Sequence, residues 1–107
     1  MLSPYFLAVM YYIYILYSES ADRYYVGHTN DPARRLTEHN TVEEMKFTTK
    51  FRPWTMPLAF EVSASRGEAI KVERFIKRQK SRTFIKKLIE YREDPGFIKD
   101  FVMDVVG

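Results

Sequence analysis

Two short runs of aromatic and branched residues near the start of the chain flank a polar stretch. Residues 11–17 (YYIYILY) and 24–28 (YYVGH) favour β-strands, because tyrosine, isoleucine and valine pack well on a pleated surface. Residues 18–23 (SESADR) have the composition of a turn. Together they predict a β-hairpin.

The register of this hairpin sets which side chains share a face. If residues 18–21 form a four-residue loop, Tyr14 faces Tyr25 and Gly27 faces Tyr12, all on one face of the sheet. Glycine within a strand often marks the close approach of a ligand or of another chain segment. Two tyrosines alone, however, are better explained by the general preference of tyrosine for strands.

Helical signals follow the hairpin. Asp31 and Pro32 are typical of an N-cap and a first helical position, and they predict a helix that runs to about Asn40. Residues 41–55 look irregular, and residues 58–62 (LAFEV) favour a third strand.

Two further helices are predicted after the third strand. Ser65 and Glu68 have the spacing of a capping box, which opens a helix to about Lys80. Ser81 is placed to cap a second helix that reaches about Glu93.

The element order strand, strand, helix, strand, helix, helix predicts an α/β (α+β) fold, in which helices flank a small three-stranded antiparallel sheet. A chain of 107 residues, 46% of them apolar, suits one small domain. We expect residues 10–93 to form it, with an N-terminal extension at 1–9 and a C-terminal tail at 94–107. The apolar start of the chain lacks the length of a transmembrane helix and the basic front of a signal peptide, so no membrane association is expected.

Cysteine usage and charge limit the function classes. The absence of cysteine excludes disulfides, thiolate metal sites and cysteine catalysis, and it suits a reducing, cytoplasmic location. Residues 66–92 carry 10 Lys and Arg against 3 Asp and Glu, a net +7, whereas residues 1–65 carry −1 and residues 93–107 carry −3. The basic stretch is a candidate polyanion footprint, although charge alone favours an ordinary solvated helix face.

The predicted helices add polar candidates to the hairpin. Arg35 and His39 are four residues apart and share one helix face, which by itself indicates no more than a surface arginine beside a half-buried histidine. Glu73 falls inside the apolar arc of its helix, where a carboxylate costs free energy unless it is paired or bound to a metal. An ion pair with Lys77 is the ordinary explanation, and a divalent cation at the floor of a cleft is the functional one.

Together these residues resemble the GIY-YIG nuclease family, as a small single-domain member similar to the catalytic domain of the excision-repair incision nuclease. The two signature strands appear as residues 12–14 (YIY) and 25–27 (YVG), with tyrosine in place of the first glycine. Arg35 follows on the first helix, His39 comes four residues later, and Glu73 follows the third strand.

The resemblance implies a metal-dependent DNA endonuclease. Glu73 would hold Mg²⁺ or Mn²⁺, and Arg35 would clamp the scissile phosphate. Tyr14 would activate the attacking water, His39 would relay its proton, and Tyr25 would orient the water or the phosphate. The sequence equally allows the roles of Tyr14 and His39 to be exchanged. The finer expectation is structure-selective cutting linked to DNA repair or recombination, with or without a recognition partner protein, and the oligomeric state is left open.

Contacts to DNA are expected from lysines and from an aromatic segment. Six lysines would contact the phosphate backbone: Lys46, Lys50, Lys77, Lys80, Lys86 and Lys87. Phe47, Phe51 and Trp54 either stack on unpaired bases or anchor a long loop on the core, and anchoring is the better-supported alternative.

Two other functions stay open at this level. A nucleic-acid-binding module without catalysis would explain the basic helices equally well, and a small RNA- or ribosome-associated protein would use the same basic face. The complete set of Tyr14, Tyr25, Arg35, His39 and Glu73 favours the nuclease, because a binding module has no need of a carboxylate at its phosphate site.

Overall fold

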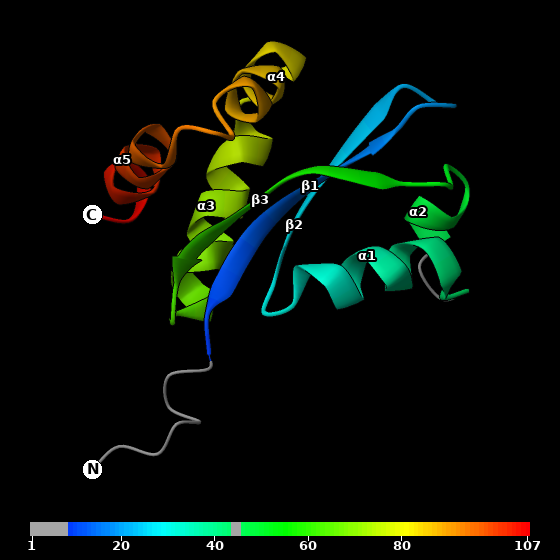
Figure 1. Cartoon of the computed structure of the whole chain (residues 1–107), viewed down its shortest axis with the longest axis horizontal. Helices are drawn as coiled ribbons and strands as arrows, with labels where there is room; N and C mark the ends of the chain where they lie inside the picture. The colour runs from blue at the N-terminus through cyan, green and yellow to red at the C-terminus, as the bar shows by residue number, and fades with distance from the viewer. Residues whose placement is uncertain (1–8, 44–45) are drawn as a thin grey trace.

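A computed structural model of the chain describes residues 9–43 and 46–107, without the side chain of Lys46. The predicted N-terminal extension at 1–9, apart from Val9, and the predicted Lys46 contact therefore lie outside the described part. In that part, helices pack against both faces of one small sheet (Figure 1).

Three strands form an antiparallel sheet in the order β2-β1-β3: β1 (Tyr11–Ser18), β2 (Arg23–Thr29) and β3 (Thr55–Ser63). The helices of the described part are α1 (Pro32–Thr41), α2 (Lys46–Thr49), α3 (Arg66–Arg78), α4 (Arg82–Glu90) and α5 (Pro95–Val106). The predicted fold class is confirmed, and element boundaries shift by a few residues. The structure adds α2 to the stretch expected to be irregular and α5 to the tail.

The hairpin register differs from the prediction by two residues. Tyr14 pairs with Gly27 rather than with Tyr25, and the loop is residues 19–22 rather than 18–21. A shift of two residues keeps every side chain on its expected face. One side of the sheet therefore still carries Tyr14, Tyr25 and Gly27.

Asp22 explains why the loop closes one residue later. Its backbone is left-handed, with φ 52°, a conformation that aspartate tolerates better than most residues. Its carboxylate accepts hydrogen bonds from the Tyr17 hydroxyl at 2.7 Å and from Arg82 at 2.5 Å. These contacts fasten the loop end to the strand and to the first turn of α4.

Side-chain caps begin the longer helices. In each cap, a side-chain oxygen accepts a hydrogen bond from the backbone N–H three residues later, at 3.0 to 3.2 Å. The capping residues are Asp31, Ser65, Ser81 and Asp94. The predicted capping box is only half formed, because the carboxylate of Glu68 accepts its hydrogen bond from the Ser63 hydroxyl at 2.6 Å. The caps satisfy backbone donors that would otherwise lack an intrahelical partner.

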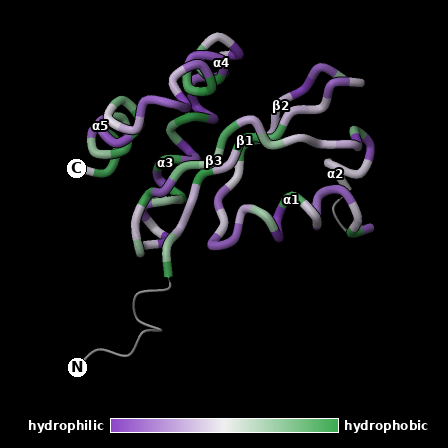
Figure 2. The backbone as a smooth tube through the Cα atoms, viewed as in Figure 1, coloured by the Kyte–Doolittle hydropathy of each residue, from purple (hydrophilic) through white to green (hydrophobic). Residues whose placement is uncertain are grey.

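The two faces of the sheet bury separate apolar clusters. The larger cluster joins the sheet to α3, α4 and α5, with Ile13, Ile15, Val26, Leu58, Phe60, Val72, Ile76, Leu88, Ile98 and Val102. The smaller cluster lies on the face covered by α1 and the segment after it, with Tyr14, Leu16 and Trp54 packed against Leu36 and Phe51. Hydrophobic positions concentrate where the three strands run side by side (Figure 2).

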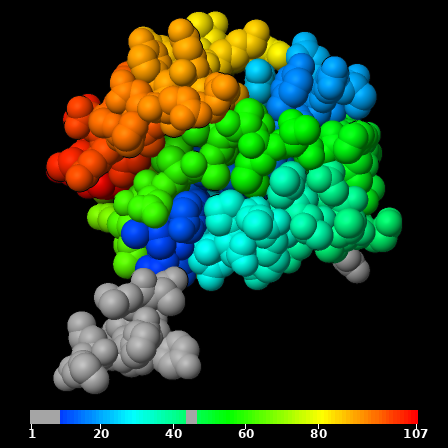
Figure 3. Space-filling model, viewed as in Figure 1, coloured from blue at the N-terminus to red at the C-terminus, as the bar shows by residue number. Residues whose placement is uncertain are grey.

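The edge strand β3 is visible from outside between the two helical layers. Figure 3 shows it as a band with α4 and α5 on one side and α1 on the other. Ile98 and Val102 of α5 are 7% and 6% exposed, so the last helix is part of the larger core. Within the described residues, no helix is long and apolar enough to cross a membrane.

Candidate active site

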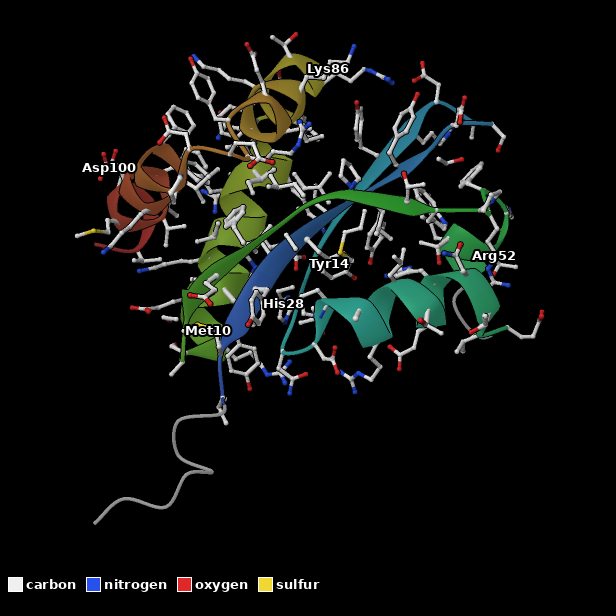
Figure 4. All side chains as sticks on the ribbon, in the orientation of Figure 1. Met10, Tyr14, His28, Arg52, Lys86 and Asp100 are labelled. Atoms are coloured by element: carbon white, nitrogen blue, oxygen red, sulfur yellow. The ribbon has the colours of Figure 1, made fainter. Side chains whose placement is uncertain are left out.

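Tyr14 lies at the centre of the candidate site, on the middle strand and between the sheet and α1 (Figure 4). It is 1% exposed. Its ring crosses the backbone of Gly27, where an added Cβ would lie 2.5 Å from the Tyr14 hydroxyl oxygen. The glycine within the strand is therefore explained by the close approach of this ring.

The Tyr14 hydroxyl links two residues of α1. It lies 2.8 Å from Nε2 of His39 and accepts a hydrogen bond from Nε of Arg35 at 3.3 Å. Nδ1 of His39 is 3.0 Å from the Thr48 hydroxyl. A neutral His39 that carries its proton on Nδ1 can donate to Thr48 and accept from Tyr14 at Nε2.

Burial sets the protonation states of this pair. It raises the pKa of Tyr14 to about 12, although the hydrogen bond from Arg35 opposes the shift. Burial, followed by the positive charge of Arg35, lowers the pKa of His39 to about 4. At neutral pH Tyr14 is therefore a neutral phenol and His39 is a neutral imidazole, which is the arrangement of a proton donor facing a proton acceptor.

Tyr25 and Arg35 complete this group on the α1 side of the sheet. The ring centroid of Tyr25 lies 6.2 Å from that of Tyr14 and 4.9 Å from that of His39. Arg35 also donates to Glu38 at 3.0 Å, and its side chain is 33% exposed. The guanidinium is thus held near Tyr14 while part of it stays accessible to a phosphate.

Glu73 lies on the opposite side of the sheet, on α3. One carboxylate oxygen is 2.6 Å from Nδ1 of His28, and the other accepts from Lys77 at 2.7 Å. Burial alone would raise the pKa of Glu73, but the hydrogen bonds from Lys77 and His28 outweigh it and lower that pKa. The Glu73 charge also contributes to the raised pKa of Tyr14, so the residues on the two sides of the sheet interact electrostatically.

His28 is a candidate that the sequence reasoning missed. It pairs with Ile13 in the hairpin and faces α3, the side opposite Tyr14 (Figure 4). A signal was present, because the alternation of β2 places residue 28 on the α3 face. The apolar arc of α3 also left Glu73 in need of a partner. Both the predicted Lys77 pair and this histidine hold the carboxylate.

A divalent cation fits the Glu73 site only if water molecules supply most of its ligands. In the described part of the chain, no three acidic or histidine side chains are grouped to hold a metal. Glu73 offers a carboxylate that is 17% exposed, and His28 offers one imidazole beside it. Mg²⁺ commonly keeps several waters and binds through one or two carboxylates, so this donor set is compatible with it. Binding would displace a hydrogen bond from Glu73.

The predicted DNA contacts are distributed over three regions. Lys77 and Lys80 line a hollow beside Tyr25. Lys86 (labelled in Figure 4) and its neighbour Lys87 are exposed on α4. Lys50 is exposed after α2.

Part of the aromatic segment is anchored on the core. Trp54 is 3% exposed, donates its indole N–H to the Thr48 carbonyl at 2.8 Å and packs edge-on against Phe51. These two rings anchor the segment on the smaller core. Phe47 is 54% exposed and does not take part in that cluster.

Comparison with known proteins adds a family to this geometry. Residues 10–88 match the GIY-YIG catalytic domain. A UPF0213 protein of Listeria welshimeri is 38% identical over 71 residues, 66% of this chain and 78% of its own length. A UPF0213 protein of Limosilactobacillus reuteri is 32% identical over 85 residues, 78% of this chain and 88% of its own. The structure-specific endonuclease subunit SLX1 of Meyerozyma guilliermondii is 37% identical over 76 residues, 66% of this chain but 26% of its own. No solved structure matches the chain.

Proposed function

The chain belongs to the GIY-YIG family, and we propose that it is a divalent-metal-dependent endonuclease that hydrolyses a phosphodiester bond in DNA. The observation that carries the proposal is the hydrogen-bonded group of Tyr14, His39 and Arg35 beside Gly27. It provides a proton acceptor and a cation next to each other, as hydrolysis of a phosphate diester requires.

Arg35 would hold the scissile phosphate through its accessible N–H groups, since its planar fork matches a phosphate better than an ammonium does. Tyr14 would take a proton from the attacking water and pass its own hydroxyl proton to Nε2 of His39. The raised pKa of Tyr14 makes this transfer necessary, because the free phenolate is scarcely populated at neutral pH. Tyr25 would orient the water or the phosphate from the neighbouring ring position.

Glu73, assisted by His28, would hold Mg²⁺ or Mn²⁺. A bound metal supplies charge neutralisation at the phosphate and at the leaving oxygen. Contacts of Lys50, Lys77, Lys80, Lys86 and Lys87 with the backbone would give affinity without sequence choice. Lys46 remains a further candidate for the same role.

The DNA structure that the enzyme cuts is a separate proposal. The SLX1 relative is named a structure-specific endonuclease subunit, so we propose cutting that depends on the structure of the DNA. Flapped and branched DNA are the first structures to test. Three further proposals rest on family analogy alone. They are a role in DNA repair or recombination, a likeness to the excision-repair incision nuclease, and a recognition partner protein. We further propose an intracellular site of action, with access to DNA.

A cleavage assay on labelled duplex, single-stranded, flapped and branched DNA tests the endonuclease, with Mg²⁺, Mn²⁺ or a chelator. Wild type is expected to cut with metal only. Glu73→Gln and Tyr14→Phe are expected to lose at least about 100-fold in rate. Glu93→Gln, a carboxylate with a side chain 91% exposed, serves as the control and is expected to cut normally.

A specific result separates the endonuclease from a non-catalytic binding module. The contacts of Glu73 with Lys77 and His28 would serve a purely structural role equally well. If folded wild type cuts none of these substrates while all variants keep salt-sensitive DNA binding, the binding module is correct. Tighter binding to RNA than to DNA would instead favour the RNA-associated protein.

A further inference from the structure

A hollow of about 410 Å³ opens across the edge of β2, next to the candidate active site. Its walls come from β2, α2, the end of α3 and the start of α4, and they include Tyr24, Tyr25, Phe47, Lys77, Lys80 and Ile85. This size lies toward the lower end of ligand pockets. Because Tyr25 also packs on His39 with centroids 4.9 Å apart, one ring is shared between the hollow and the site.

Phe47 is the unusual side chain of this hollow. It is 54% exposed, and its ring lies 6.2 Å from that of Tyr25. Behind it, Phe51 packs edge-on with centroids 5.5 Å apart, and Phe51 in turn packs on the buried Trp54. The smaller core uses Phe51 and Trp54 but does not include Phe47. An aromatic ring is thus supported from inside and presented to solvent at the rim of a pocket.

Two lysines also line the same hollow. The Lys77 side chain is 49% exposed, and its ammonium is 5.7 Å from the centroid of the Tyr25 ring. Lys80 is exposed in the junction between α3 and α4, where its backbone is left-handed with φ 48°. In addition, β2 is an edge strand, so its outer backbone groups have no partner strand among the described residues.

We propose that this hollow is a subsite for one unpaired nucleobase of the DNA strand that is cut. The base stacks against Phe47 and the neighbouring Tyr25 ring. The phosphate attached to it binds Lys77 and Lys80. Aromatic stacking combined with a cationic groove is how proteins hold single-stranded nucleic acid irrespective of sequence. The position of the base relative to the cut rests on the proposed endonuclease function, whereas binding of the base does not require cutting.

Binding is tested in chelator with a single-stranded oligothymidine that carries one 2-aminopurine, whose fluorescence is quenched by stacking. Wild type is expected to quench it. Phe47→Ala is expected to bind about 5- to 100-fold more weakly and to lose the quenching, and Phe47→Trp is expected to retain both. The control is Met103→Ala, because this residue is 58% exposed and lies on α5, away from the hollow.

A charge variant keeps the test independent of the fold around α2. Lys80→Glu is expected to weaken binding of the same oligonucleotide, whereas Lys99→Glu on α5 makes the same charge change outside the hollow and is expected to weaken it less. Equal quenching in wild type and Phe47→Ala, with equal effects of the two lysine variants, would overturn the subsite. No quenching by wild type would overturn it as well.

Cleavage separates this inference from the endonuclease itself. In Mg²⁺, Phe47→Ala is expected to slow cutting of flapped DNA more than cutting of fully paired duplex. Normal cutting by both proteins with unchanged 2-aminopurine signals would reject the subsite and leave the endonuclease standing. Quenching that depends on Phe47, in a protein that cuts no substrate, would reject the endonuclease and leave the subsite standing.

Discussion

Gly27 has no side chain where the Tyr14 ring lies across β2. A Cβ at this position would be 2.5 Å from the Tyr14 hydroxyl oxygen and 2.6 Å from the ring carbon that bears it. Both distances are far inside van der Waals contact, so the ring would have to move. Because that hydroxyl also contacts His39 and Arg35, the glycine determines the geometry of this hydrogen-bonded group.

Gly27→Ala is therefore expected to destabilise the fold by about 1–3 kcal/mol, the cost typical of overpacking a filled site. It should also reduce cleavage strongly, because the Tyr14 hydroxyl is displaced. Gly67→Ala is the matched control, since its Cβ would approach nothing closer than 3.6 Å and alanine favours a helix. Urea unfolding and the cleavage assay check both variants, and equal stability of the two would contradict the packing explanation.

In the folded protein, His39 stays neutral down to a pH well below 6.5, because its pKa is lowered from 6.5 to about 4. Burial is the main cause, with the charges of Arg35 and Arg52 adding to it and Glu38 opposing it. Between these two pH values the unfolded histidine binds a proton and the folded one does not. Lowering the pH therefore favours the unfolded chain. As far as His39 is concerned, the full free energy of unfolding is present only above about pH 6.5, where this residue is neutral in both states.

Wild type is expected to lose about 3 kcal/mol of stability from this residue between pH 6.5 and pH 4. His39→Gln is less stable at neutral pH, because it disturbs the Tyr14 and Thr48 contacts, but it should show a shallower decline over the same range. Urea unfolding of both proteins at several pH values measures the difference. Parallel declines would show that His39 does not titrate as its burial indicates.

The order and spacing of short motifs made five site residues predictable, since a hairpin fixes the face of Tyr14 and Tyr25 and a helix fixes the face of Arg35 and His39. Whether those five act in catalysis remains a prediction. His28 was not predicted, because its role depends on a contact with Glu73 at a sequence separation of 45 residues. Neither strand alternation nor helix periodicity specifies which residues meet across that separation.

At the level of elements, the hairpin shows what a pattern leaves undetermined. Two registers that differ by two residues give the same inward and outward faces, so hydrophobic alternation does not distinguish them. The observed register is selected by the left-handed backbone of Asp22 and by its contacts with Tyr17 and Arg82. Arg82 lies 60 residues away in sequence, beyond the reach of local reasoning.

The last helix, in contrast, carried a signal that was not used. Asp94 and Pro95 repeat the pairing of Asp31 and Pro32 that correctly placed the start of α1, and both aspartates cap their helices. Acidic residues interrupt the apolar ones in this tail, and no helix is predicted there from the sequence. In the structure, Ile98 and Val102 fall one turn apart on the buried side of α5.

The Asp94 cap can be tested against its neighbour. Asp94→Ala is expected to cost about 1 kcal/mol, because the first turn of α5 loses a hydrogen bond of 3.0 Å to the Phe97 N–H. Glu93→Ala changes a side chain that is 91% exposed and should alter stability by less than about 0.5 kcal/mol. Thermal or urea unfolding compares them, and an equal loss in both would argue against the cap.

At the scale of the whole molecule, the sheet holds the candidate site together from both faces. Tyr14, Tyr25, Arg35 and His39 belong to the α1 side, whereas Glu73 and His28 belong to the α3 side. The two groups interact electrostatically, since the charge of Glu73 helps to raise the pKa of Tyr14. The geometry therefore depends on two cores that share three strands, and the larger of these cores extends to α5.

Val102→Ala tests whether α5 supports the fold without taking part in the chemistry. The side chain is 6% exposed within the larger core, so its truncation should cost about 2 kcal/mol. Met103→Ala removes a neighbouring side chain that is 58% exposed and should cost less than about 0.5 kcal/mol. Because the residues of the candidate site lie on other elements, both variants should cut DNA at the wild-type rate at temperatures where they are folded. A normal unfolding midpoint for Val102→Ala would mean that α5 is not held against the sheet, whereas slowed cutting by the folded variant would mean that this core also positions Glu73.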